Sequence, residues 1–343
     1  MKRNKFNVKK QIKKKIELNM VSKSERNKLR EPNYSHKPID VNLLTKSERN
    51  KLRINDFKNV DYNKQIFEFK FNIHQLSDIP TSIIFSYKES SEDRKRNLQN
   101  ILKYFSHYLS NNVEIILVEQ DVKNKINWLD KIENNKYIKH IFLKNNNIFN
   151  KGWGFNVGAK FAKSNHLIFN DSDVLVSPDI YQASIKLLDG FDIINPYKNL
   201  YWLNEEETIK LISGDNKTKF KLNRIILSPS VISGGIFLIK KNKFLELKGF
   251  DENSFGWGYQ DYIFDEKIKK LNLSVKIVES LGIHLHHEGT PKPGVNNIAD
   301  GDVYYSFKDR NKNIYESYKE MTDIEILEKI RRTKRFGEGG IEI

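Results

Sequence analysis

Two carboxylates with the spacing of a metal-binding pair follow an apolar stretch of this chain. Residues 166–169 form a run long enough for one buried strand, and Asp171 and Asp173 come directly after it. Side chains alternate along an extended chain, so the two carboxylates should point the same way. They repel each other unless a cation lies nearby, and such oxygen ligands suit Mg²⁺ or Mn²⁺. Ordinary turn and N-cap chemistry before a helix near Pro178 is the alternative.

Histidines gather in a second candidate stretch. His284, His286 and His287 account for three of the eight histidines in the chain. His284 and His286 are two residues apart, so they face the same way on an extended segment. Imidazoles together with aspartate suit Mn²⁺, whereas a zinc site would need a cysteine or a further histidine cluster that this sequence does not contain. Each histidine by itself is more often a hydrogen-bonded core or surface residue.

A glycine-containing loop supplies the third candidate. Gly256-Trp257-Gly258 sets a large aromatic side chain between two flexible residues, where it can swing or stack on a sugar ring. Asp261 follows at the start of a predicted amphipathic helix and could act as a general base toward an attacking hydroxyl group. Its alternative role is simple stabilisation of that helix, because the helix dipole favours an acid in the first turn.

The elements that must position these residues alternate between strands and helices. Strands are predicted at 81–87, 113–118, 138–143, 166–169, 192–195, 236–239 and 275–278. Helices are predicted after Ser90 or Ser91 with an apolar face from Leu98 to Leu109, around 126–132, after a glycine turn at 152–154, at 180–188, at 241–247 and from Asp261. This alternation predicts a mostly parallel sheet with right-handed crossovers.

In sheets of this kind, ligands bind at the carboxyl ends of the strands. Glu119 and Asp121 end the second predicted strand, and Asp171 and Asp173 follow the fourth. Arg94 lies early in the helix after the first strand, where a cation opposes the helix dipole, so a bound anion would explain it. Turn, cap and solvated-surface roles are the alternatives for these charged residues.

The composition excludes several classes of protein. The chain has 343 residues and no cysteine, which excludes disulfides and thiolate metal sites. No apolar run approaches the roughly 18 residues of a membrane helix, and no apolar stretch follows the basic N-terminus as it would in a secretory signal. We therefore expect a soluble, cytoplasmic protein.

The net charge of +15 is concentrated in residues 1–64. This part holds 19 Lys and Arg against 7 Asp and Glu, and it repeats KSERNKLR at 23–30 and 46–53. We expect a basic arm, partly disordered or in short helices, that could touch an anionic membrane surface or an acidic partner. A solvated tail is the alternative, and no motif indicates specific nucleic-acid binding. A charged excursion at 204–223 looks like an insertion or a lid.

Several short segments, taken in order, resemble one enzyme family. They are RKRNL at 94–98, VEQD at 118–121, FNKGWGFNVG at 149–158, NDSDV at 170–174, the block from Gly234 through GWGYQD to Asp261, and HLH at 284–286. Together they resemble the beta-1,4-galactosyltransferase family and related bacterial capsule-type family 2 glycosyltransferases, over roughly residues 80–290. Each segment alone is a weak signal, whereas the GWG block with an upstream DxD and a downstream HxH is fairly specific.

The resemblance implies an α/β domain of the GT-A fold, with a mixed, mostly parallel sheet flanked by helices. That domain would span 65–300, with a nucleotide-binding half at 80–175 and an acceptor and catalytic half at 176–300. A helical extension would follow at 301–343. The implied activity is a metal-dependent, inverting transfer from a UDP-sugar, with galactose or N-acetylgalactosamine favoured, to a glycan or glycolipid acceptor in surface polysaccharide synthesis. Mn²⁺ or Mg²⁺ would be the cofactor, and the enzyme could lie peripherally on the inner face of the membrane.

The resemblance also implies roles for individual residues. Asp261 would be the catalytic base for in-line attack of the acceptor hydroxyl on the anomeric carbon. The metal ligands would be Asp173, His284 and His286. The donor would be bound by Arg94, Glu119, Asp121, Asn156, Asp171 and Trp257, and the acceptor by Trp257 and Gln260.

One departure limits what the resemblance implies. The family usually has Glu-Asp where this chain has Gln260-Asp261, so the family's acceptor preference is not carried over. Two other classes of function are the alternatives. One is a non-catalytic protein that binds sugars or polyanions on the same scaffold, and the other is a nucleotidyltransferase or phosphohydrolase.

Overall fold

The computed structural model describes residues 76–214, 225–227, 232, 235–288, 307–334, 336–338 and 341–342. They all belong to one unit of the chain, Arg53–Ile343. The basic arm predicted at 1–64, with its proposed membrane contact, lies outside the described residues. So does most of the charged excursion after residue 214.

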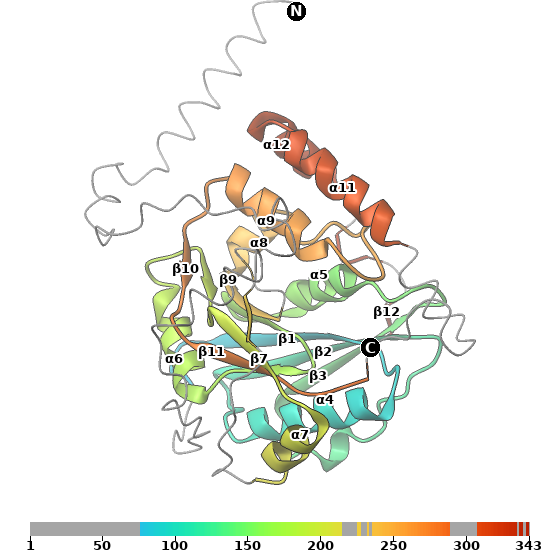
Figure 1. Ribbon diagram of the computed structural model, residues 1–343, viewed down its shortest axis with the longest axis vertical. Helices are drawn as coiled ribbons and strands as arrows, with labels where there is room; N and C mark the ends of the chain where they lie inside the picture. Colours follow the sequence, from blue (N-terminus) through green and yellow to red (C-terminus); the bar gives the residue numbers. More distant parts are fainter. Residues whose placement is uncertain are drawn as a thin grey trace, which may run out of the picture. The chain divides into compact units, whose positions relative to one another are not determined.

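A mixed sheet forms the centre of the described residues (Figure 1). Its strand order is β10-β6-β9-β4-β1-β2-β3-β12. The bounds are β1 Thr81–Tyr87, β2 Val113–Asp121, β3 Ile138–Lys144, β4 His166–Asn170, β6 Ile193–Asn195, β9 Ile236–Lys240, β10 Val275–Ile277 and β12 Ile341–Glu342. The four strands from β4 to β3 are parallel, whereas β9 and β12 run antiparallel to their neighbours. The predicted mostly parallel sheet flanked by helices is confirmed.

Alternate residues of β1 build the cores on the two faces of this sheet. Ile83 and Phe85 belong to the core that includes Leu98 and Phe105 of helix α4 (Glu92–Ser106). The predicted apolar face of that helix is confirmed as far as Phe105, whereas Leu109 reaches the same core from beyond the helix end. Ile84 belongs to the opposite core, with residues of α5 (Lys151–Phe161), α8 (Lys241–Glu246) and α9 (Gln260–Lys270). Figure 1 shows α4 and α5 on opposite faces. This layering brings the N-termini of α4 and α5 to the carboxyl edge of the sheet.

The glycines at 152 and 154 lie inside helix α5, not in a turn before it. The helix begins instead at the N-cap Asn150, whose side chain accepts a hydrogen bond from the Trp153 amide. The reason for glycine is close packing, because a Cβ atom at Gly154 would lie 2.1 Å from Ser86 Oγ. The helix therefore rests directly on β1, which fixes the height of its first residue, Lys151.

The helix predicted around 126–132 is wrong. Only a short 3₁₀ turn, Leu129–Lys131, forms there. The side chain of Asn124 accepts a hydrogen bond from the Ile126 amide, and such local bonds compete with helix formation. Ile126 and Ile132 are nevertheless buried, so the apolar residues reach the core without a helix.

A second, smaller sheet has the strand order β5-β11-β7-β8. Its strands are β5 Val174–Leu175, β7 Asn199–Trp202, β8 Ile225–Leu227 and β11 Leu281–His284. His284 pairs with Val174 on one side and with Trp202 on the other. This register places His284 beside the residue that follows Asp173.

Four further helices complete the described residues. They are α6 Pro178–Leu187, α7 Glu205–Ile212, α11 Lys308–Glu320 and α12 Asp323–Arg332. Helix α7 opens the predicted excursion with a capping box between Asn204 and Glu207. Helices α11 and α12 pack on α9 through a small core that includes Ile263, Tyr318 and Ile326. None of the helices among the described residues is both long enough and apolar enough to cross a membrane.

Candidate active site

The turn after β4 presents two carboxylates to different partners. The side-chain amide of Asn170 donates to the carbonyl oxygens of Asp171 at 2.7 Å and Val174 at 2.9 Å, which closes the turn. The segment is therefore not extended, and the prediction that both carboxylates share one side through strand alternation is wrong. Asp171 contacts Lys151, whereas Asp173 contacts the histidines.

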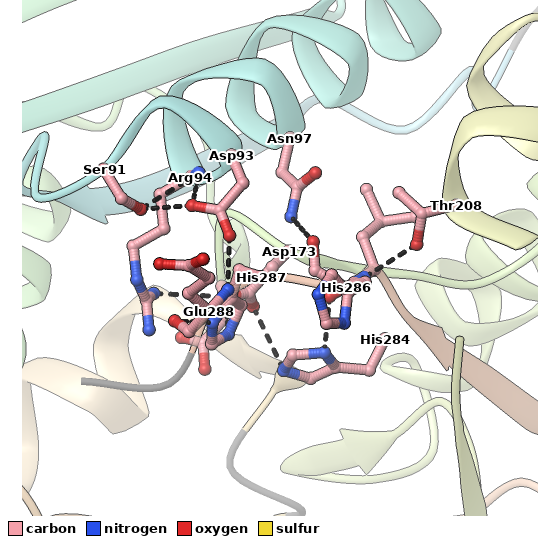
Figure 2. Close-up of polar contacts among 12 residues, drawn as sticks. Ser91, Asp93, Arg94, Asn97, Asp173, Thr208, His284, His286, His287 and Glu288 are labelled. Atoms are coloured by element: carbon pink, nitrogen blue, oxygen red, sulfur yellow. Dashed lines mark hydrogen bonds and ion pairs between the residues drawn. The ribbon is translucent and has the colours of Figure 1, made fainter. Parts of the chain in front are cut away.

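Three side chains converge on the buried carboxylate of Asp173 (Figure 2). Nε2 of His284 lies 3.7 Å from Oδ1, and Nε2 of His287 lies 3.2 Å from Oδ2. A guanidinium nitrogen of Arg94, in the first turn of α4, lies 3.4 Å from Oδ2. One ligand atom from each of Asp173, His284 and His287 lies within 4.8 Å of the other two. Among the described residues, this group could hold a metal ion.

Both histidines hold their other ring nitrogen in a hydrogen bond. Nδ1 of His284 lies 2.8 Å from the carbonyl oxygen of Leu285, and Nδ1 of His287 lies 2.8 Å from that of Glu288. A carbonyl can only accept, so each Nδ1 carries a proton and donates it. Burial alone would lower the pKa of His287, but Asp173 raises it, so a proton on this ring is favoured when no cation is bound. In the neutral form of each ring, the Nε2 lone pair faces the Asp173 carboxylate. A divalent cation would resolve this meeting of acceptors, and the nitrogen and oxygen ligand set fits Mn²⁺.

The charges around Asp173 favour its ionised form. Burial alone would raise the pKa of Asp173, but His284, His287 and Arg94 hold that pKa well below its usual range. Burial lowers the pKa of His284, which favours the neutral ring that binds metals. The ring of Trp202 stacks on that of His284 with centroids 4.1 Å apart, and this contact restricts the movement of the imidazole.

The structure places His287 beside Asp173, in place of the predicted ligand His286. Strand β11 ends at His284, and the amide of Leu285 donates to the carbonyl oxygen of Asp173 at 2.7 Å. The chain turns there, so strand alternation no longer decides which side chains share a face. His286 contributes its backbone amide and carbonyl groups to the site instead.

Helices α4 and α7 hold that backbone from two sides (Figure 2). The amide of His286 donates to Oγ1 of Thr208 at 2.8 Å. Its carbonyl oxygen accepts from Asn97 at 2.9 Å and from Arg96 at 3.1 Å. The next turn is also fixed, because the Glu288 amide donates to the Asp93 carboxylate. The histidine segment 284–288 is therefore held by the fold itself.

Lys151 links the second carboxylate to the predicted base. Its ammonium lies 3.1 Å from an oxygen of Asp171 and 3.6 Å from an oxygen of Asp261, which opens helix α9. Burial alone would lower the pKa of Lys151, but Asp171 and Asp261 raise it above its usual range. The lysine therefore stays charged, and its ammonium attracts both carboxylates.

Glu119 and Asp121 form a separate acidic group at the end of β2. Glu119 is fully buried and bonds the Lys125 amide at 2.8 Å and the ring of His140 at 3.0 Å. Asp121 lies 2.7 Å from the ammonium of Lys125. No contact joins this pair to Asp173 among the described residues. Its predicted role in donor binding stays a prediction.

The remaining predicted residues belong to the loop that precedes α9 or support it. Asn156 is fully buried and uses its amide on Phe250 and Glu252, so its contacts hold a turn and do not face Asp173. Gln260 donates to the carbonyl oxygen of Ser254 at 2.6 Å. The ring of Trp257 is 45% exposed, and the ammonium of Lys308 lies 5.2 Å from its centroid.

Sequence reasoning missed four residues that build the site: His287, Lys151, Asn97 and Thr208. The first two stood in the motifs already singled out, HLHHE and FNKGWG. A count of charges at the motif FNKGWG would have marked Lys151, because a lysine at the start of a helix opposes the dipole just as Arg94 does. Asn97 stands in the RKRNL segment at 94–98 without a role assigned to it, and no sequence signal marked Thr208.

The chain resembles known proteins in its fold and, over part of its length, in its sequence. The search of curated proteins found no significant match. Solved structures with a similar fold include the catalytic domain of Drosophila beta-1,4-galactosyltransferase 7 in complex with xylobiose, at 14% identity, a TM-score of 0.39 and coverage of 73% of this chain and 82% of that one. They also include S. aureus TarS in complex with UDP-GlcNAc, at 14% identity, a TM-score of 0.47 and coverage of 74% and 72%.

These distant structural likenesses bring no substrate and no residue role to this chain. The family evidence is of a different kind, because it rests on the sequence itself. The sequence model described as "Glycosyltransferase like family 2" matches residues 82–325, which include all strands of the main sheet except β12, the histidine segment and the loop before α9. The chain belongs to this family of glycosyltransferases.

Proposed function

We propose that this chain transfers a sugar from a UDP-sugar to a hydroxyl group of a glycan or glycolipid, with a divalent cation held by Asp173, His284 and His287. One observation carries the proposal. A single turn after β4 directs one carboxylate to two histidines and the other to Lys151, which also contacts Asp261. A metal-binding group and a candidate base therefore stand at the same strand end, as an enzyme that activates a leaving group and a hydroxyl requires.

The charges of the site fit such a cation. The carboxylates of Asp171, Asp173 and Asp261 lie beside two fixed cations, Arg94 and Lys151, and burial raises the pKa of Asp171 to about 7. A divalent ion would add positive charge to this site and favour the approach of an anionic diphosphate. Two imidazoles and a carboxylate favour Mn²⁺ over Mg²⁺, which prefers oxygen ligands and water. The resemblance favours UDP-galactose or UDP-N-acetylgalactosamine as donor.

The residues then divide the reaction between them. Asp261 accepts the proton of the acceptor hydroxyl while that oxygen forms its bond to the anomeric carbon. The bond from that carbon to the diphosphate breaks, and UDP leaves with the electron pair. A single displacement inverts the anomeric configuration. Lys151 holds Asp261 in place, and Arg94 can donate to the diphosphate. When bound, the cation supplies positive charge that stabilises the leaving group.

A thermal-shift panel followed by a UDP-release assay tests this function. A ligand at 100 times its dissociation constant adds about 2.7 kcal/mol to the free energy of unfolding, which is readily seen as a higher melting temperature. We expect a Mn²⁺-dependent shift with UDP and with one of UDP-galactose, UDP-N-acetylgalactosamine, UDP-N-acetylglucosamine or UDP-glucose. The shift should disappear in Asp173→Ala and persist in Asp130→Ala, which removes an exposed carboxylate elsewhere.

Two outcomes would replace the proposal with its alternatives. A folded protein that shows no shift with any nucleotide would favour the non-catalytic sugar-binding class. Release of pyrophosphate or phosphate in place of UDP would identify a nucleotidyltransferase or phosphohydrolase.

A further inference from the structure

Asn311 is a fully buried polar residue on helix α11, outside every motif that the sequence singled out. Its side-chain nitrogen lies 2.9 Å from the carbonyl oxygen of Phe255, 3.5 Å from that of Trp257 and 3.0 Å from that of Gly258. All three neighbours can only accept, so the amide must present its NH₂ group to them. One side chain thus gathers three carbonyl groups of a single loop.

The loop needs such a partner because its backbone is strained. Gly256, Gly258 and Tyr259 all have positive φ, at 71°, 96° and 63°. Glycine adopts this conformation freely, but at Tyr259 it costs roughly 1–2 kcal/mol. A loop in this conformation persists only when its surroundings hold it. On the other side, the Gly256 amide donates to the Phe149 carbonyl oxygen at 3.0 Å, so the loop is fixed from the body and from α11.

The carbonyl groups that Asn311 binds lie beside the residues that matter for chemistry. Trp257 carries the exposed indole, and Gly258 stands three residues before Asp261. Fixing the backbone at Gly258 therefore sets the indole and the start of α9 together. Asp261 must point at Lys151, and a shift of this helix end would move it away.

Helix α11 has its own anchors, so its position does not depend on Asn311. Tyr318 packs in the core shared with Ile263 and Ile326, and its hydroxyl donates to the Asp251 carboxylate at 2.8 Å. The rings of Tyr259 and Tyr315 stack with centroids 5.6 Å apart. The helix lies along α9 (Figure 1), and these contacts make it a rigid support.

We propose that Asn311 is a positioning residue of this glycosyltransferase, which holds the Trp257 loop and the Asp261 helix end in their working geometry from the C-terminal helix. The proposal rests on the proposed function for its effect on turnover, but its effect on the loop is independent of that function. It extends the machinery of the site by a helix that begins 47 residues after Asp261.

Hydrogen exchange of the loop tests the positioning directly. Asn311→Asp keeps the shape of the side chain but turns a negative oxygen toward three carbonyl oxygens, and Asn311→Ala removes the amide altogether. Asn313→Asp, on the exposed side of the same helix, is the matched control. In both Asn311 variants, amides of residues 254–262 should exchange about tenfold faster or more, which corresponds to about 1.4 kcal/mol of local opening. The control should match the wild type.

Kinetics then separate positioning from a general structural defect. With Mn²⁺ and the UDP-sugar that the wild type uses best, UDP release should fall about 10- to 100-fold in the Asn311 variants, as expected when a catalytic group is displaced. The dissociation constant of UDP, measured by calorimetry with Mn²⁺, should stay within about twofold, because its proposed site lies at the strand ends. Equal losses of UDP binding and turnover would indicate a structural role and overturn the proposal.

The outcomes distinguish failure of the positioning from failure of the function. Unchanged exchange at 254–262 in folded Asn311 variants would overturn the positioning, whatever the activity. A wild type that neither binds nor releases UDP, combined with faster exchange in the variants, would overturn the proposed function alone. If both variants unfold, the test is hydrogen exchange of the wild type in rising concentrations of urea. The proposal requires that residues 254–262 lose their protection at the same urea concentration as α11. Independent opening of the two segments would contradict the proposal.

Discussion

Two regions carry side chains to the candidate active site, and they are held in different ways. The histidine segment 284–288 continues strand β11, and its backbone is bonded to β5, α4 and α7. The loop at 249–261 has no strand partner, contains three residues of positive φ after Phe255 and takes its support from α11 and from the segment around α5. The first region is part of the sheet, whereas the second is held largely by side-chain contacts, some of them from a helix far along the chain.

This difference suggests a division of tasks. Metal ligands must keep a fixed geometry, so a segment bonded to the sheet suits them. A loop that covers or contacts a substrate has to open and close, and such loops come from the less stable parts of a fold. We therefore expect a change in one region to leave the other nearly unaltered. The predictions below test that independence.

The largest effect is expected at His287, which the structure places beside Asp173 where the sequence predicted His286. His287→Ala removes a ring whose Nε2 lies 3.2 Å from Asp173, and we expect its affinity for Mn²⁺ to fall by about 100-fold or more. His286→Ala is the matched control, because His286 contributes its backbone to the segment, and its Mn²⁺ affinity should stay within a few-fold. Titration with Mn²⁺ followed by electron paramagnetic resonance measures both. A larger loss in His286→Ala would restore the ligand set that the sequence predicted.

A smaller effect is expected when the segment loses one of its supports. Thr208→Val keeps the shape of a fully buried side chain but removes the acceptor of the His286 amide. An amide left without its partner costs about 1–3 kcal/mol, and supports of metal ligands typically contribute 10- to 100-fold to affinity. We expect about tenfold weaker Mn²⁺ binding, with unchanged hydrogen exchange at 254–262. Thr208→Ser retains the hydroxyl group and should bind Mn²⁺ like the wild type; a loss there would point to packing as the cause.

The comparison also shows how much of the site could be predicted from the sequence. The strand ends could be predicted because apolar runs bounded by polar residues mark buried strands, and β1, β2, β3, β4 and β9 all lie where the runs are. The carboxyl edge then follows from the parallel topology, so Arg94, Asp171 and Asp173 were found together. Alternation failed at His286 because it applies only within a strand, and β11 ends two residues earlier.

Positioning residues could not be predicted from the sequence, for a different reason. Asn97, Thr208 and Asn311 act on carbonyl or amide groups of segments far away along the chain. Asn97 lies inside the RKRNL segment, but nothing there pointed to its role, because the partners of all three residues are backbone atoms that every residue has. Only the packing of α4, α7 and α11 against the site reveals them. Lys151 is intermediate, since its motif was noticed but its two partners, Asp171 and Asp261, come from different elements.

The smallest effect should arise in the support of the loop, and it completes the test of independence. Tyr318→Phe keeps the ring in its core but removes the hydroxyl that donates to Asp251 at 2.8 Å. A hydrogen bond to a charged group contributes about 1.5–3 kcal/mol, so urea unfolding should show a loss at or below the lower end of that range. Because Asp251 lies in the loop, exchange at 254–262 should become faster, while Mn²⁺ affinity stays within about twofold. Tyr137→Phe, which removes a hydroxyl far from both regions, controls for the chemical change. A Mn²⁺ affinity that fell together with loop protection would show that the two regions form one unit, and α11 would then support the whole site.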